Sequence, residues 1–262
     1  MILFWFGLFI LVCGLLLLLY MVREAFLNKV VKHKLFFSDF PESLGEVTIF
    51  FISDIHKRTI SDQIIDEVMG KADLVIIGGD LTEKGVPFER VKTNIVKLKQ
   101  VGPVYFVWGN NDYEVDFRKL DAVLLDLGVK VLANTAVTFE STQGEKLCLL
   151  GVDDMSQDRD QLDLALSDAE VNSFKIIACH IPAIVKKILP EHEIRLVLSG
   201  HTHGGQIHLF GYSPYKRGGI KKLNNTILFI SNGYGTTALP LRLGAPAESH
   251  LITLQRGTEK LG

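Results

Sequence analysis

The chain of 262 residues is 47% hydrophobic and carries a formal net charge of −2, which fits one sizeable core plus an additional segment. The balanced charge and the lack of a basic stripe argue against a nucleic-acid-binding protein. Three cysteines do not make a disulfide framework: Cys13 lies in an apolar run, and Cys148 and Cys179 lie in strand-like runs where a buried thiol is the default.

Residues 1–22 contain no charged side chain, and as a helix rising about 1.5 Å per residue they could cross a hydrocarbon core of about 30 Å. A secretory signal peptide is disfavoured, because no basic residue precedes the apolar run and no small-residue cleavage site follows it. We therefore expect an uncleaved, single-pass transmembrane anchor in the cell membrane. Arg23, Lys29, Lys32 and Lys34 follow it against one glutamate, which predicts that the rest of the chain is cytoplasmic.

Residues 23–46 are expected to be a basic juxtamembrane linker. Its first half mixes apolar and basic side chains and could continue the helix along the membrane surface. A solvated linker is an equal alternative. Pro41 and Gly45 predict a loop in its second half, and His33 is assigned no role.

From residue 47 onward, short apolar runs recur, and each ends in polar or glycine-rich sequence. We expect such strands over residues 47–52, 74–77, 104–107, 176–179 and 196–198. Helical patterns over 61–69, 88–99, 116–127, 158–171 and 183–189 separate several of them. Apolar strands separated by helices are typical of an α/β protein whose sheets are covered on their outer faces.

Further strands with shorter connections are expected over 129–132, 136–140, 147–150, 206–209, 227–231 and 249–255. The sequence contains no repeat, low-complexity tract or second linker. We therefore expect one domain over residues 47–256, followed by a short C-terminal tail over 257–262.

Seven potential metal ligands lie at the ends of the five apolar strands, where open α/β sheets keep their ligands. They are Asp54, His56, Asp80, Asn110, His180, His201 and His203. Each short motif is weak alone, but five in register at strand ends favour a metal site. Oxygen and imidazole donors without thiolates suit Mn²⁺, Fe²⁺ or Zn²⁺. Seven ligands exceed what one ion with an open position needs, and predict two ions about 3.5–4 Å apart, bridged by a carboxylate and a water or hydroxide.

The ordered motifs resemble the signature of the calcineurin-like metallophosphoesterases. They are Asp54-Ile-His56, Gly79-Asp80, Gly109-Asn110-Asn111-Asp112, His180 and Gly200-His201-Thr202-His203. The motif Gly-His-Thr-His-Gly-Gly-Gln and the tail that begins at Gly233 are similar to those of the bacterial membrane-associated branch of the family. The resemblance covers residues 47–254 and implies a four-layer α/β/β/α sandwich of two mixed sheets.

The resemblance also implies how the ligands divide between the ions. Asp54, His56 and His203 would hold one ion, Asn110, His180 and His201 would hold the other, and Asp80 would bridge them. The family usually has a histidine after the ligand asparagine, where it helps the leaving oxygen to depart. Asn111 occupies this catalytic position here, and it can donate a neutral hydrogen bond but cannot act as an acid. Asp112 would be the orienting partner of a histidine placed there.

The expected function is therefore hydrolysis of phosphate esters or anhydrides by in-line attack of a metal-bridging hydroxide. The anchor favours a phosphodiester or pyrophosphate of a lipid-linked or nucleotide substrate. Two alternatives stay open: a phosphatase of soluble nucleotides or phosphoproteins, and a catalytically weakened metal-binding scaffold. The sequence does not indicate the oligomeric state.

Three further groups lie near these motifs. His208 is close enough in sequence to line the site. The basic loop over residues 215–222 and Arg242 could contact an anionic substrate or lipid head groups. A solvated loop is the alternative for both.

Overall fold

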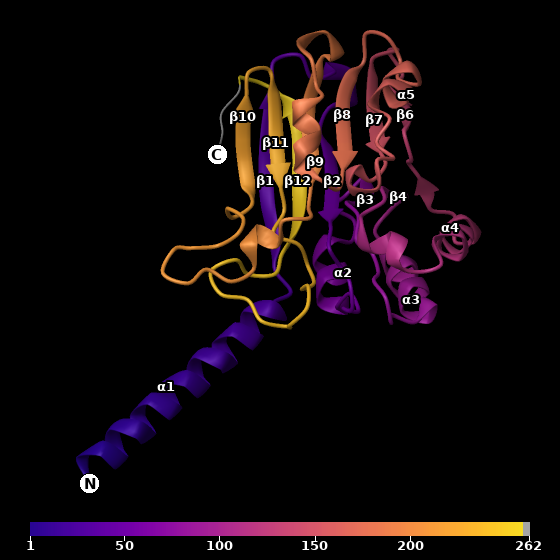
Figure 1. The fold of residues 1–262 in the computed structure, drawn as a ribbon. Helices are drawn as coiled ribbons and strands as arrows, with labels where there is room; N and C mark the ends of the chain where they lie inside the picture. The colour runs from indigo at the N-terminus through magenta and orange to yellow at the C-terminus, as the bar shows by residue number, and fades with distance from the viewer. Residues whose placement is uncertain (259–262) are drawn as a thin grey trace.

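Two six-stranded mixed sheets face each other between layers of helices in the computed structural model (Figure 1). The structure describes residues 1–258, so most of the tail expected over 257–262 lies outside the described residues. The arrangement confirms the predicted four-layer α/β/β/α sandwich. One long helix projects from it at the N-terminal end of the chain.

The first sheet joins one strand from the end of the domain to the first five strands of the chain, and the second sheet consists of the six strands between them. The first sheet has the order β1 (Val30–Phe37), β12 (Ser249–Arg256), β2 (Val47–Ile52), β3 (Leu74–Ile77), β4 (Val104–Phe106) and β5 (Lys130–Val131). The second has the order β10 (Gly219–Leu223), β11 (Thr226–Ile230), β9 (Ile194–Ser199), β8 (Phe174–Cys179), β7 (Lys146–Val152) and β6 (Thr135–Glu140). Strands β2 to β5 run parallel to one another in the first sheet, as do β7, β8, β9 and β11 in the second. The carboxyl ends of these parallel strands therefore lie together at one edge of each sheet.

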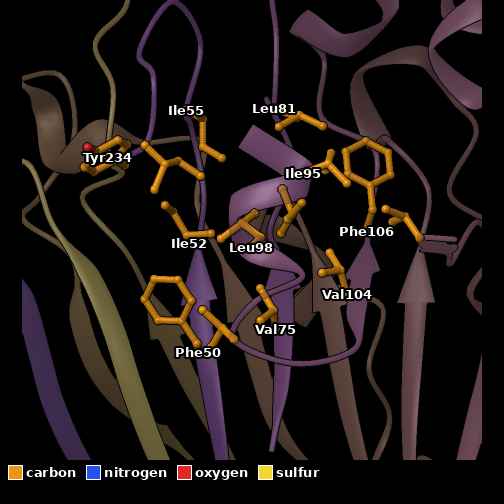
Figure 2. Packing of buried hydrophobic residues seen from close by; sticks show 14 of the residues in the cluster. Phe50, Ile52, Ile55, Val75, Leu81, Ile95, Leu98, Val104, Phe106 and Tyr234 are labelled. Atoms are coloured by element: carbon orange, nitrogen blue, oxygen red, sulfur yellow. The ribbon is translucent and has the colours of Figure 1, made fainter. Parts of the chain in front are cut away.

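Alternation of side chains along the strands divides the core into three layers. Phe51 and Ile76 face the second sheet, where they join a cluster that includes Phe229. Their neighbours Phe50 and Val75 face the other way and pack, with many more residues, against the helices that cover the first sheet. Figure 2 shows this second cluster, in which Ile95 and Leu98 of α3 lie over the strands. A third cluster covers the outer face of the second sheet.

Within residues 1–258, five α-helices accompany the strands: α1 (Ile2–Ala25), α2 (Asp62–Val68), α3 (Phe88–Leu98), α4 (Phe117–Asp126) and α5 (Leu162–Ser167). The Ser61 hydroxyl accepts a hydrogen bond from Gln63 N at 3.3 Å and caps α2, as its sequence position predicts. The predicted helix over 158–171 is too long, because Asp158 has a left-handed φ of 53°. The segment predicted as a helix over 183–189 is a 3₁₀ helix, Pro182–Lys186.

The largest correction concerns the expected linker over 23–46 and the domain boundary at residue 47. Residues 30–37 form β1, which pairs in parallel with β12 from Val30↔Ser249 to Phe37↔Arg256. Leu35 and Phe37 are buried in the core between the sheets, while Lys32 is exposed. The lysines of this strand belong to the basic residues that follow the anchor, and for this reason the segment was interpreted as a linker. The folded domain therefore includes β1.

Two predictions in the last third of the chain, one of a strand and one of a loop, are also wrong. Residues 206–209 form isolated bridges, not a strand. Conversely, β10 (Gly219–Leu223) begins inside the expected loop over 215–222 and pairs antiparallel with β11. Lys221 and Lys222 are exposed on this edge strand, as is common on sheet edges, so the segment carries no apolar run that sequence inspection could detect.

The helix α1 has a mean hydropathy of 2.9 over its most apolar window, and none of that window is buried. Among the described residues it is the one helix long and apolar enough to cross a membrane. Its last turn belongs to the domain, since Ala25 is buried. Arg58 donates hydrogen bonds to the carbonyl oxygens of Ala25, Phe26 and Leu27 at 3.3, 3.3 and 3.1 Å. These bonds satisfy acceptors that a helix end leaves open, and they attach α1 to the domain.

Candidate metal centre

The seven predicted ligands lie together at the carboxyl ends of the parallel strands of both sheets. The first sheet contributes Asp54 and His56 after β2, Asp80 after β3 and Asn110 after β4, and the second contributes His180 after β8 and His201 and His203 after β9. The main-chain N–H groups of Ile55 and His56 donate to Asp80 O at 2.8 and 3.1 Å. Adjacent strand ends are thereby fixed against each other.

Five of the seven residues have a left-handed backbone. The φ angles are 54° at Asp54, 51° at His56 and Asp80, 68° at His201 and 48° at His203. Such a conformation costs a residue other than glycine on the order of 1–3 kcal/mol. The surrounding fold sustains this cost at five neighbouring positions, and the result is that their side chains converge.

The first group of ligands consists of Asp54, His56 and His203, whose ligand atoms all lie within 4.8 Å of one another. His203 Nε2 lies 3.1 Å from His56 Nε2 and 3.4 Å from Asp54 Oδ1. Two further bonds orient the Asp54 carboxylate: Ser53 Oγ donates to Oδ2 at 2.6 Å, and His201 N donates to Oδ1 at 3.0 Å. The three side chains therefore present their ligand atoms to one another.

Asp80 connects this group to the second. Its Oδ2 lies 3.2 Å from His180 Nε2 and 3.7 Å from His56 Nε2. The ligand atoms of Asp54, Asp80 and His180 also lie within 4.8 Å of one another. His201 Nδ1 lies 3.0 Å from Asn110 Oδ1. Asp80 therefore occupies the position expected of a bridging carboxylate.

The surroundings of His180 test whether these residues fit a metal ion. Its Nδ1 donates to the carbonyl oxygen of Gly78 at 2.8 Å, which leaves Nε2 as the acceptor nitrogen. Nε2 is fully buried and, among the residues that the structure describes, makes no hydrogen bond, although it faces Asp80 Oδ2 at 3.2 Å. Two lone pairs at that distance repel each other unless a proton or a cation lies between them. The arrangement fits a divalent cation.

The pKa values also indicate that a proton and a cation compete for the position between His180 and Asp80. Burial lowers the pKa of His180, but Asp80 raises it to about 10, so a proton occupies this position when no cation does. Burial would raise the pKa of Asp80, but His180 and His56 lower it to about 2, and the carboxylate stays ionised. Burial, with the charges of His56 and Arg242, lowers the pKa of His203 to about 4. A neutral His203 at pH 7 is the form that binds metals.

Glu83 is a site residue that sequence inspection missed. Its Oε2 lies 3.0 Å from His56 Nδ1, and Lys57 Nζ lies 2.7 Å from its Oε1. Contact with His56 and then with Lys57 lowers the pKa of Glu83. A carboxylate behind a metal-binding histidine fixes the ring and raises its basicity. The available signal was an acidic residue three positions after Asp80, in the same strand-end loop.

Arg242 has a different role from the expected one, because it is fully buried and cannot meet a substrate from solution. Nη1 donates to His203 O at 3.1 Å, and Nη2 donates to Asn232 O at 2.6 Å and Gly235 O at 2.7 Å. Nη2 also lies 3.2 Å from His203 Nδ1. Arg242 therefore positions the loop that carries His203.

Asn111 lies half-buried at the start of a 3₁₀ helix, Asn111–Glu114. Its main-chain N–H donates to Asp80 Oδ1 at 2.8 Å, and its Nδ2 donates to Glu114 Oε1 at 3.0 Å. Asp112 does not face this side chain: its carboxylate accepts from the main-chain N–H groups of Gly109 and Asp80 at 2.9 and 2.8 Å. Glu114, and not Asp112, is the carboxylate beside position 111.

His208 stabilises the loop that follows His203. Its Nε2 donates to the carbonyl oxygen of Gly204 at 2.7 Å. In the 206–218 loop, Tyr215 approaches a predicted ligand: the centroid of its ring lies 6.3 Å from that of His201.

A sandwich of two mixed sheets with a histidine and carboxylate cluster at its strand ends defines a metal-dependent hydrolase. The chain belongs to the calcineurin-like phosphoesterases, because the model of that family matches residues 47–205. This confirms the family, and with it the class of phosphoester hydrolases, that the motifs resemble.

Similar proteins occur in bacteria and animals. The chain is 46% identical over 210 residues to the uncharacterized protein YpbG of Bacillus subtilis, covering 79% of this chain and 81% of that protein. It is 31% identical to an uncharacterized metallophosphoesterase of Helicobacter pylori, covering 80% of this chain and 60% of that protein. It is 30% identical to a bovine protein named transmembrane protein with metallophosphoesterase domain, covering 82% of this chain and 54% of that protein.

Proposed function

We propose that this chain is a membrane-anchored phosphoesterase that uses two divalent ions to hydrolyse phosphate esters or anhydrides. The observation that carries the proposal is the place of Asp80, whose Oδ2 lies 3.2 Å from His180 of one sheet and 3.7 Å from His56 of the other. A carboxylate between two imidazoles suits a ligand shared by two ions. Oxygen and imidazole donors match Mn²⁺, Fe²⁺ or Zn²⁺.

When bound, such ions lower the pKa of water and neutralise charge on phosphoryl oxygens. Asp54, His56 and His203 would hold one ion, Asn110, His180 and His201 the other, and Asp80 both. The main-chain N–H of Asn111 keeps the Asp80 carboxylate in place. The side-chain amide of Asn111 would offer the leaving oxygen a neutral hydrogen bond but no proton.

Membrane anchoring is supported by α1, which is apolar and exposed up to its last turn. The name of the bovine relative describes a transmembrane protein with a domain of the same family. The basic residues that follow α1 favour a cytoplasmic domain.

A cavity of about 610 Å³ supports the proposal that the protein binds an anionic substrate at the membrane surface. Phe26, just after α1, lines one part of it, and the basic side chains Lys57, Arg58 and Arg90 line another. Lys57 directly follows the predicted ligand His56. The basic side chains of this cavity, which lies next to the end of α1, suit the phosphate of a lipid-linked phosphodiester or pyrophosphate.

Hydrolysis assays of the full-length protein in detergent test the proposal. Bis(4-nitrophenyl) phosphate should be turned over with Mn²⁺ and not after chelation, and His180→Ala should abolish the Mn²⁺-dependent rate. Asp126→Asn, at an exposed carboxylate of α4, should keep it. A screen of phosphomonoesters, phosphodiesters and pyrophosphates then ranks substrate classes.

A metal-binding scaffold without turnover is the second candidate, and Asn111 is the observation that favours it. Bound metal in the wild type without hydrolysis of any of these substrates would select the scaffold over the enzyme.

A further inference from the structure

The turn at residues 209–212 holds large apolar side chains in water at a conformational cost. Leu209 N donates to Tyr212 O at 3.0 Å, and Tyr212 N donates to Leu209 O at 2.8 Å. The turn requires a left-handed φ of 50° at Phe210, which favours glycine over an aromatic residue. Phe210 is nevertheless fully exposed, and 84% of Tyr212 and 59% of Leu209 are exposed. Among the described residues, none buries the Phe210 side chain in return.

A second apolar segment lies beside this turn. Leu239 is 62% exposed. The Gln206 amide connects the two segments, since Nε2 donates to the carbonyl oxygens of Thr237 and Leu239 at 3.1 and 3.3 Å, and Oε1 accepts from Thr237 N at 3.0 Å. Main-chain bonds from His208 N to Leu243 O, and from Leu243 N to Gln206 O, join them further. We call Leu209, Phe210, Tyr212 and Leu239 the apolar rim.

The loop that carries Leu239 of the apolar rim is hydrogen-bonded to the end of α1. Arg242 N donates to Met21 O at 3.0 Å, and Ala247 N donates to Glu24 O at 3.0 Å. In Figure 1 the loop before β10 and the loop before β12 lie at the end of the domain from which α1 departs. Lys216 and Arg217 are exposed in the same loop as the turn, as charges that favour an anionic surface.

We propose that the apolar rim inserts into the interface of the same phospholipid bilayer that α1 enters, as a second membrane contact. Exposed aromatic and leucine side chains flanked by basic residues are the usual chemistry of such contacts. Tyr215, in the same loop, lies beside His201. Contact with the bilayer therefore places the border of the metal centre at the head groups. This inference rests on the membrane placement in the proposed function and not on hydrolysis.

Lipid quenching of a fluorescent label tests this contact in the full-length chain. Phe210→Cys, made with Cys13→Ala, leaves one accessible thiol, because Cys148 and Cys179 are buried. An environment-sensitive dye at position 210 should shift to the blue in vesicles of phosphatidylcholine and phosphatidylglycerol, and brominated phosphatidylcholine should quench it. The matched control is Val171→Cys, at an exposed site before β8 and thus at the opposite end from the metal centre, where the dye should show neither effect.

Lipid-independent emission at position 210, equal to that at position 171, would overturn the proposal. A blue shift that grows with protein density but resists brominated lipid would mean contact between copies, and would overturn it too. In a second variant, Phe210→Asp should reduce quenching of a label placed by Tyr212→Cys, since a carboxylate resists insertion. Quenching should persist in the inactive variant Asp80→Asn. A wild type that is quenched by brominated lipid but hydrolyses no substrate would count against the proposed function and leave this contact standing.

Discussion

Glu83 supports the metal centre from behind a ligand, because His56 faces Asp80 with Nε2 and Glu83 with Nδ1. Loss of a carboxylate behind a metal-binding histidine lowers metal affinity by roughly 10–100-fold. We therefore expect Glu83→Gln to raise the Mn²⁺ concentration that gives half-maximal hydrolysis by that factor, with the rate largely recovered at saturating Mn²⁺. Glu89→Gln, at an exposed helix glutamate, is the control. An unchanged Mn²⁺ titration would remove Glu83 from the site.

We propose that Asn111 gives the leaving group no proton, whereas an acid at its position contributes roughly 10²- to 10⁴-fold to proton transfer. Without one, anhydrides and activated diesters should react faster than alkyl monoesters, with a steep dependence of rate on leaving-group pKa. Asn111→His should flatten this dependence, with Glu114 as the carboxylate in reach. The measurement is a series of aryl and alkyl esters with both proteins. Equal rates for both classes, unchanged by Asn111→His, would mean that another group supplies the proton.

That the seven predicted ligands lie together could be predicted from the sequence, because each follows an apolar strand within a short motif. Glu83 and Arg242 were not, because their partners lie in other loops and the contacts exist only after the sheets assemble. Arg242 also shows that a basic residue in a polar tail need not face solvent. The sequence could not tell a substrate contact from a group that bonds main-chain carbonyls.

At the scale of elements, the strand β1 brings His33 against His250 of β12. His33 Nε2 lies 3.2 Å from His250 Nδ1, and His250 Nε2 lies 2.9 Å from Ser231 Oγ. The ring of Phe229 packs against both imidazoles. Burial lowers the pKa of His33, and burial together with His33 lowers that of His250 well below its usual value. Both side chains are therefore neutral in the fold at pH 7.

This pair should make stability fall in acid. Below a pH of about 6.5 the unfolded chain binds protons that the folded pair resists. The free energy of unfolding should then decrease with falling pH, by at most about 1.4 kcal/mol per pH unit for His250. Urea titrations between pH 7 and 5 measure this slope, and it should be shallower in His33→Gln. The same slope in both proteins would show that other groups control acid sensitivity.

Apolar strands were predicted well, with small shifts at their ends. The strands β1 and β10 were missed because both carry lysines, which read as linker and loop. The place of β1 depends on pairing with β12 at the other end of the domain, and this pairing leaves no local pattern in either strand.

At the scale of the whole molecule, α1 and the domain are connected by the hydrogen bonds of Arg58 and Arg242 to its last turns. We expect α1 to remain on the mature protein and the domain to be cytoplasmic, because Arg23 and the lysines after it follow the apolar segment. A reporter fused at the C-terminal end tests the side of the membrane. Reporter activity confined to the outside of intact cells, or a mature N-terminus beyond Val22, would contradict this orientation.

The central claim is that the Asp and His cluster holds two divalent ions with Asp80 shared between them. The measurement that tests it most directly is the metal content per chain of the wild type and Asp80→Asn after saturation with Mn²⁺ and removal of free ion. We expect two tightly held ions in the active wild type, and loss of at least one ion with loss of hydrolysis in Asp80→Asn, whose circular dichroism should stay unchanged. Two tightly bound ions in an active Asp80→Asn protein would contradict it.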